Sequence, residues 1–186
     1  MSDRATNLTD QEGTLLALVL RAQPITVYEI SKVYEASPVS NFNTSKGKLY
    51  PMVRRLKGLG LIESKAVAGD GRGTEKLHCT AAGKKSVKAW LGQIRPAHLL
   101  LDDPLRTRIQ SFTLLSQSEQ RAWLEDIREQ LVAKLAELAD YEDQVDVPFH
   151  AIVHDNAVSS LEARLAWVDR SLASIGAKQR KRAGAK

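Results

Sequence analysis

The chain has 186 residues, of which 43% are hydrophobic and 26% charged, and a formal net charge of +5. This balance is typical of a folded chain with a core, and the length allows one large domain or two small ones. No apolar run reaches the ~18–20 residues that cross a bilayer, and the first residues lack the apolar segment of a signal peptide. The single cysteine, Cys79, excludes an internal disulfide framework and an all-cysteine metal site. We therefore expect a protein of the reducing cytoplasm.

Positive and negative charges are unevenly distributed along the chain. Residues 1–95 carry fifteen Lys and Arg against eight Asp and Glu, a net charge of +7, whereas residues 96–177 carry seven against fourteen, a net charge of −7. The segment 178–186 adds five positive charges and no acid. Such asymmetry is typical of an anion-binding part joined to a part that binds no polyanion. We expect a basic domain (1–95), an α-helical domain (96–177) and a basic disordered tail (178–186).

Helix-start motifs open the basic domain. Thr9 with Glu12, and Thr26 with Glu29, have the spacing of a capping box, in which each side chain satisfies a backbone N–H group at the start of a helix. Pro24 separates the two helices that these boxes predict. Two helices with a tight connection are therefore expected before residue 40.

A third helix is expected to start at Thr44 or Ser45 and to end at Gly58 or Gly60. At about 100° per residue, one arc of this helix is apolar and must face the core: Leu49, Met52, Val53 and Leu56. The opposite arc holds Gly47, Lys48, Tyr50, Pro51, Arg54 and Arg55. Arg and Lys neutralise phosphates or meet guanine edges, and a Tyr hydroxyl can reach a phosphate. The opposite arc therefore predicts a helix that reads duplex DNA, with a merely solvated basic face as the alternative.

A hairpin and a fourth helix complete the basic domain. Strand-like segments 61–68 and 74–80 flank GDGRG (69–73), whose glycines are typical of a hairpin tip. Thr80 can cap a fourth helix, whose apolar face is expected to hold Val87, Trp90, Leu91 and Ile94. Three helices, a hairpin and a helix in this order predict a winged helix-turn-helix.

Two positions near the predicted DNA surface leave alternatives open. Pro51 disturbs the preceding helical turn, so the start of the third helix is bent or lies later than Ser45. Arg72 at the hairpin tip can follow the DNA backbone or enter the minor groove, and the alternative is a solvent-exposed turn. The neighbouring Asp70 argues against a purely electrostatic tip.

The second half of the chain is predicted to be helical. Asp103 and Pro104 begin a short helix, Ser116 and Glu119 form a third capping box before a long helix, and a last helix follows Pro148. Heptad-spaced apolar residues run along both long helices: Leu124, Leu131, Leu138, Leu161, Leu165, Val168 and Leu172. An isolated helix pair cannot bury two such seams, so we expect a second copy of the chain to cover them, with packing on the N-terminal domain as the alternative.

Four stretches of the basic domain carry a family resemblance: LTDQEGTLLALVL (8–20), PITVYEISKVYE (24–35), KLYPMVRRLKGLGLIES (48–64) and TAAGKKSVKAWL (80–91). Their most specific parts are Tyr50-Pro51, Arg55-Leu56 and Gly60-Leu61-Ile62. On these residues the first 95 or so positions resemble the PadR family of bacterial transcriptional regulators. The helical remainder is similar to the larger PadR subgroup in length and helix layout only.

The resemblance implies a homodimeric, usually repressing regulator whose C-terminal helices dimerise. It also implies DNA contacts by the recognition-helix residue Tyr50 and by Lys46, Lys48 and Arg72. With the exposed arc of the third helix, the candidate DNA-binding residues are Thr44, Ser45, Lys46, Lys48, Tyr50, Arg54, Arg55 and Arg72. The second wing strand departs from the family pattern, because residues 74–80 lack an aromatic residue and include an acid.

PadR-like proteins often respond to small aromatic or otherwise apolar ligands. Trp90, Trp123 and Trp167 are expected near the domain junction and are candidate effector-binding residues by this resemblance, with core or interface packing as the alternative. His150 and His154 are spaced as a possible metal pair, but two ligands without a cysteine predict no metal and no cofactor. No P-loop, G-x-S-x-G or G-x-G-x-x-G motif is present, so no enzyme is expected.

The predicted fold is mainly α: a winged helix-turn-helix of three helices and a two-stranded wing, then a helical dimerisation domain with long antiparallel helices. The predicted function is a cytoplasmic, DNA-binding transcriptional regulator, a homodimeric repressor that reads a pseudo-palindromic operator and is released by a small ligand. The alternative is a winged-helix protein-interaction module that does not bind DNA. The cationic arc of the third helix favours the regulator, because a docking surface would expose apolar residues instead.

Overall fold

The computed structural model describes residues 7–37, 46–67, 73–99, 103–142 and 147–183, with the backbone alone at Lys46 and at 176–183. It divides into two compact units, Met1–Leu100 and Leu101–Lys186, which we describe separately. The fold is mainly helical with a two-stranded antiparallel wing, as predicted. Within the described ranges, none of the helices is long and apolar enough to span a membrane.

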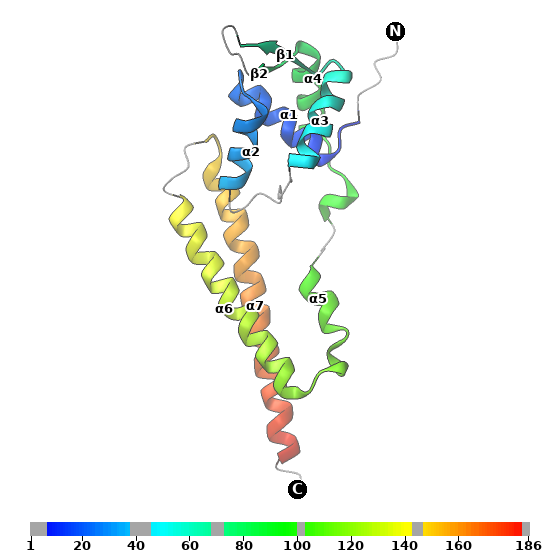
Figure 1. Ribbon diagram of the computed structural model, residues 1–186. Helices are drawn as coiled ribbons and strands as arrows, with labels where there is room; N and C mark the ends of the chain where they lie inside the picture. The colour runs from blue at the N-terminus through cyan, green and yellow to red at the C-terminus, as the bar shows by residue number, and fades with distance from the viewer. Residues whose placement is uncertain (1–6, 38–45, 68–72, 100–102, 143–146, 184–186) are drawn as a thin grey trace. The chain divides into compact units, whose positions relative to one another are not determined.

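The N-terminal unit contains the elements expected of a winged helix-turn-helix. In chain order they are α1 (Asp10–Ala22), α2 (Val27–Ala36), α3 (Lys46–Gly58), β1 (Ile62–Ala66), β2 (Glu75–Cys79) and α4 (Ala81–Leu91). Figure 1 shows α1 among the other helices, and α1 contacts α3, α4 and β2. Helix α1 therefore packs both against α3 and against strand β2 of the wing.

The predicted capping boxes are confirmed. The Thr9 hydroxyl accepts from the Glu12 amide at 3.2 Å while the Glu12 carboxylate accepts from the Thr9 amide at 3.0 Å, and Thr26 and Glu29 repeat the arrangement at α2. Thr80 caps α4 through a hydrogen bond from the Gly83 amide. These local hydrogen bonds explain why the starts of the helices could be predicted.

The wing pairs β1 with β2 in an antiparallel register that runs from Ile62 opposite Cys79 to Ala66 opposite Glu75. Gly73 has φ +66°, a conformation that a hairpin end requires and that glycine adopts without strain. One pairing was not predicted: Ile25 and Leu77 exchange both backbone hydrogen bonds, at 3.3 and 2.8 Å. This bridge joins the connection between α1 and α2 to the wing.

A single apolar cluster forms the core of the N-terminal unit. Its fully buried members include Leu15 and Leu16 of α1, Leu49 and Leu56 of α3, and Leu77 of β2. Leu77 occupies the middle of the wing strand that lacks an aromatic residue, so a leucine fills the core from this position.

The predicted apolar face of α4 is wrong beyond Trp90. The helix ends at Leu91, and the amide of Gly92 bonds back to the carbonyl oxygens of Lys88 and Trp90. Leu91, the last residue of α4, is exposed, and Ile94 is exposed because the chain has left the helix before it reaches this position. Val87 and Trp90 do pack on the core.

The C-terminal unit contains α5 (Pro104–Ile109), α6 (Gln117–Glu142) and α7 (His150–Ala183). The predicted caps are present, because Asp103 accepts from the Leu105 amide at 2.9 Å and Ser116 and Glu119 form a capping box. Figure 1 shows α6 and α7 side by side, and an ion pair of 2.8 Å joins Arg128 to Asp169 across them.

The expected disordered tail is a further difference between prediction and structure. Helix α7 continues to Ala183, so the backbone of 178–183 is helical. Gln, Arg, Lys and Ala are good helix formers, and cations interact favourably with the carbonyl end of a helix. The basic composition of this segment is therefore compatible with a helix end as well as with disorder.

Candidate nucleic-acid interface

Helix α3 has the two faces that its sequence predicts. Leu49 and Leu56 have no exposed surface, Val53 is buried, and Met52 packs partly against the same core. Helix α3 contacts α1, α2 and β1 through this face. The buried face therefore determines which side chains of α3 point to solvent.

The solvent face of α3 is cationic and carries an aromatic hydroxyl. Lys48, Pro51 and Arg54 are exposed, and the side chain of Tyr50 is 55% exposed. Helix α3 is continuous through Pro51. Among the described residues, neither Lys48 nor Arg54 forms an ion pair, and both are exposed to solvent.

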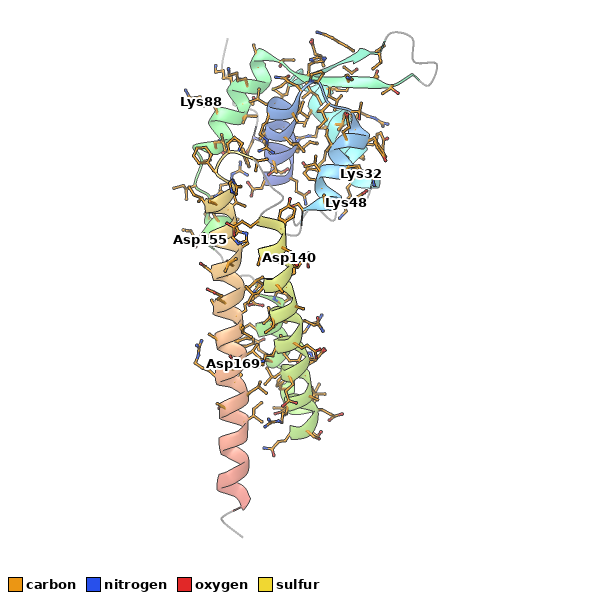
Figure 2. All side chains as sticks on the ribbon, turned by 90° about the vertical axis from the view of Figure 1, so that its left-hand side faces the viewer. Lys32, Lys48, Lys88, Asp140, Asp155 and Asp169 are labelled. Atoms are coloured by element: carbon orange, nitrogen blue, oxygen red, sulfur yellow. The ribbon has the colours of Figure 1, made fainter. Side chains whose placement is uncertain are left out.

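Figure 2 shows Lys48 and Lys32 on one side of the N-terminal unit, and Lys88 on α4 at the other side. Lys32 is engaged with Glu35 at 2.7 Å. Other predicted DNA-binding positions, Thr44, Ser45, Arg72 and the side chain of Lys46, lie outside the described residues.

Arg55 behaves differently from Lys48 and Arg54. Its guanidinium Nη1 donates to Oε1 of Glu12 on α1, and it is 50% exposed whereas the Glu12 side chain is only 7% exposed. The other carboxylate oxygen of Glu12 accepts the Thr9 amide. Arg55, which is predicted to contact DNA, is thus paired with a buried acid of α1, a helix that contacts α3.

The pKa of Glu12 reflects two opposing effects. Burial alone would raise the pKa, but hydrogen bonds from Arg55 and from the amide and hydroxyl of Thr9 outweigh burial and hold it below its ordinary value of 4.5. The carboxylate is therefore ionised at neutral pH, and Arg55 is its counter-ion.

Replacing Glu12 by glutamine is expected to make the free energy of unfolding less dependent on pH in the acid range. Because the folded pKa lies below the unfolded one, the unfolded state binds more protons in acid, and the contribution of Glu12 is lost as the pH falls from about 4.5 through the folded pKa. At pH 7 the variant should be less stable by about 1–3 kcal/mol. Urea unfolding between about pH 3 and pH 7 measures the difference. A gap that stays constant across this range would contradict the assignment.

The wing is tied to the C-terminal end of α3 by one lysine. Lys57 Nζ donates to Ser64 Oγ on β1 at 2.7 Å and to Glu75 Oε2 on β2 at 3.0 Å. The hydrogen bond from Lys57 holds the pKa of Glu75 below its usual range. The acid that departs from the family pattern therefore has a local partner on α3.

The three tryptophans pack within their own units. The Trp90 indole N–H donates to Asp10 at 3.2 Å, and a Cβ on Gly13 would overlap its ring. Trp123 meets Phe112 edge to face at 5.2 Å between ring centroids, and Trp123 and Trp167 pack against the core of the C-terminal unit. A role for them in effector binding stays a prediction.

The predicted dimerisation residues lie in a seam within one chain. Leu124, Leu138 and Val168 are at most 1% exposed, and Leu131 is 8% exposed. The partly buried residues Leu161, Leu165 and Leu172 pack against the same cluster. A large part of this seam is thus covered by the pairing of α6 with α7, contrary to the expectation that a second copy must cover it. Short helices can supply further cover, since Ile109 and Phe112 join the cluster.

An open groove of about 500 Å³ lies on the surface of the α6–α7 pair. It is lined by Glu125, Arg128, Glu129, Val132 and Leu172. None of the three tryptophans is among these lining residues.

Histidines and acids form no metal cluster in the part of the chain that the structure describes. His154 lies 3.3 Å from Glu142, and the ring Nδ1 of His150 lies 3.2 Å from the carbonyl oxygen of Val147. The two histidines therefore have separate protein partners.

Sequence reasoning missed three features of this region. The role of Glu12 as the partner of Arg55, the attachment of the wing by Lys57, and the bridge between Ile25 and Leu77 all join residues far apart in the chain. The capping box did indicate that Glu12 is held at a helix start, but nothing local indicated its second partner.

The sequence and the fold were compared with those of known proteins. Residues 15–89 match the model of the transcriptional regulator PadR-like family. No curated protein sequence matches the chain. The crystal structure of Bacillus subtilis PadR in complex with operator DNA is similar with a TM-score of 0.76 and 20% identity, covering 90% of this chain and 99% of that one.

Two further crystal structures share the arrangement. A PadR-like transcriptional regulator from Bacillus cereus has a TM-score of 0.71 and 19% identity, covering 94% of this chain and 99% of that one. Bacillus subtilis PadR in complex with p-coumaric acid has a TM-score of 0.73 and 20% identity, covering 89% and 98%. Residues 15–89 thus match the model of the PadR-like family of transcriptional regulators, and most of the chain shares the fold of the solved PadR-like structures.

Proposed function

We propose that this protein regulates transcription by binding duplex DNA with the solvent face of α3. The observation that carries the proposal is the division of α3 into a buried apolar face and an exposed face with Lys48, Tyr50 and Arg54. A helix with this pattern fits the major groove, where cations meet phosphates and guanine edges. The net charge of +7 on residues 1–95 supports attraction to a polyanion.

The wing is the second element of the proposed DNA surface. Lys57 holds both strands to the end of α3, so β1 and β2 have a defined position beside this helix. We propose that Arg72, at its tip, contacts the DNA backbone or minor groove together with the residues at the start of α3. The crystal structure of the similar Bacillus subtilis PadR in complex with operator DNA supports DNA as the partner.

Replacing Lys48 by alanine is expected to weaken duplex binding about tenfold at low salt, since one phosphate contact is lost. Tyr50→Ala should weaken binding by a similar factor. The measurement is fluorescence anisotropy of a labelled duplex, selected by the wild-type protein from genomic fragments, over a range of salt concentrations. Wild-type affinity should fall steeply as the salt concentration rises.

Lys88→Ala provides the matched control for this experiment. It removes the same charge from the same unit, but from α4 on the other side, and should leave the affinity within about twofold. If wild-type protein does not bind duplex DNA even at low salt, the alternative of a protein-interaction module without DNA binding takes the place of this proposal.

We further propose that the protein acts as a homodimeric repressor that reads a pseudo-palindromic operator. Two copies would present two α3 helices about one helical turn (~34 Å) apart along DNA. Because the α6–α7 seam is largely internal, we propose that a second copy covers exposed apolar side chains of these two helices and their connection, which among the described residues are Val132, Val147, Phe149, Ile152 and Val153. The proposed function places the protein with DNA, in the cytoplasm.

Sedimentation of the full chain at about 10 μM is expected to give a dimer, and Ile152→Glu should shift it toward monomer by placing a charge in the interface. Val33→Glu, on an exposed apolar residue of α2, is the matched control and should leave the dimer intact. A wild-type monomer at this concentration would contradict the homodimer.

A small aromatic effector that releases DNA is the third part of the proposal. Its support is the complex of the similar Bacillus subtilis protein with p-coumaric acid, together with three tryptophans that could report or contact a ring. A change in tryptophan fluorescence on titration with phenolic acids, accompanied by loss of duplex binding, is the expected observation.

A further inference from the structure

We propose that Arg55 positions the recognition helix through Glu12 and does not bind phosphate. The inference rests on the proposed function, because it assigns a role within the DNA surface of α3. It also divides the cations of that surface into two classes: Lys48 and Arg54 are available to DNA, whereas Arg55 is committed to the protein.

Hydrogen bonds hold Arg55 and Glu12 in place. Glu12 Oε1 accepts from Arg55 Nη1, and Glu12 Oε2 accepts the Thr9 amide at 3.0 Å. The Glu12 side chain is 7% exposed, so water can hardly replace a lost partner. Both oxygens of a nearly buried carboxylate are thus occupied, and one of them depends on Arg55.

Moving Arg55 to a phosphate would leave that carboxylate without its counter-ion. Removing one partner of a desolvated charge pair is costly, because the remaining charge stays buried and unpaired. A phosphate on the DNA surface would bind the same guanidinium in water, where a charge pair is worth little. The balance keeps Arg55 on Glu12 when DNA binds.

The pair adds a polar constraint to the rotation of α3, which its buried apolar face already limits. Lys48 and Arg55 are seven residues apart, so they lie about 20° from one another and about two turns apart along the helix. Glu12 belongs to α1, whose Leu15 and Leu16 are completely buried. Holding Arg55 against this well-packed helix therefore helps to set the direction in which Lys48 points.

Salt dependence separates positioning from phosphate contact. Each phosphate contact that is lost lowers the magnitude of the slope of log affinity against log salt by about 0.9. Lys48→Gln should show this change. Arg55→Gln should weaken binding of the selected duplex by about 3- to 10-fold with the wild-type slope, because α3 is misaligned while the phosphate contacts are retained.

Glu12→Gln is the sharpest variant, because the two explanations predict opposite signs. Removing a negative charge near DNA would by simple electrostatics strengthen binding, whereas loss of the positioning contact weakens it by about 3- to 10-fold. The double variant with Arg55→Gln should bind no more weakly than either single one, since both remove the same contact. Circular dichroism at the assay temperature identifies variants that are folded.

Glu12→Asp covers the case in which the glutamine variants unfold. It keeps the charge but withdraws the carboxylate by one methylene, and should weaken binding partly with an unchanged slope. A reduced slope in Arg55→Gln like that of Lys48→Gln, tighter binding by Glu12→Gln, or wild-type affinity in a folded Glu12→Asp would each overturn the inference. A wild type that does not bind the duplex at about 50 mM salt would instead overturn the proposed function, and the inference with it.

Discussion

Replacing Leu56 by alanine is expected to lower the free energy of unfolding by about 2–5 kcal/mol. Leu56 is completely buried on the core face of α3, in one apolar cluster with side chains of α1 and the wing. An alanine at this position would leave a cavity, because the surrounding side chains cannot fully fill the vacated space. Its carbonyl oxygen also accepts the Leu61 amide at 3.0 Å where the chain turns into β1. Urea denaturation followed by circular dichroism measures the loss.

Tyr50→Ala is the control for Leu56→Ala, on the opposite face of the same helix. Because Tyr50 is 55% exposed, its replacement should change stability by no more than about 0.5 kcal/mol while affecting DNA binding. Leu56→Ala and Tyr50→Ala together test whether the two faces of α3 separate folding from function. Equal stability losses in the two variants would show that the faces are not separated in this way.

Replacing Gly83 by alanine is expected to destabilise the N-terminal unit by about 2–3 kcal/mol. A Cβ at this position would overlap the carbonyl oxygen of Leu61 and lie 2.7 Å from Sγ of Cys79, so α4 has to move away from the wing. The gain in helix propensity, about 1 kcal/mol, offsets only part of this cost. Thermal unfolding would report the change as a lower Tm.

Gly58→Ala is the matched control for Gly83→Ala. A Cβ on Gly58, the last residue of α3, would meet no atom within 4 Å. Stability should therefore be unchanged or raised by up to about 1 kcal/mol. A Gly83 variant that unfolds like wild type would mean that α4 and the wing can separate at little cost.

Both large effects arise where secondary-structure elements meet, and the same is true of the features that sequence reasoning missed. Capping boxes, prolines and glycines act over a few residues, so the helix starts at Thr9, Thr26 and Thr80 were predictable. The apolar arc of α3 was predictable for the same reason, since helical periodicity alone places Leu49 and Leu56 on one face.

Which partner a face or a charge meets is decided by tertiary packing. Arg55 lies on the outward arc of α3 by periodicity, but α1 brings Glu12 to it from 43 residues away. Glu75 is an acid at a wing position where the family resemblance predicts basic residues, and the structure places Lys57 beside it as its partner. A charge pattern along the chain counts cations without showing which of them already have a partner.

Tertiary packing also decides what covers the apolar faces of the C-terminal helices. Heptad spacing correctly indicated that Leu124, Leu138 and Val168 are buried, yet it could not indicate whether the covering helix belongs to the same chain or to another. By itself, the sequence determined the helices, the wing and the PadR-like character of residues 15–89, because these depend on short-range hydrogen bonds and periodicity. Only the tertiary structure decided that the seam is largely internal and that Arg55 is paired, because both depend on contacts between residues that are far apart in the sequence.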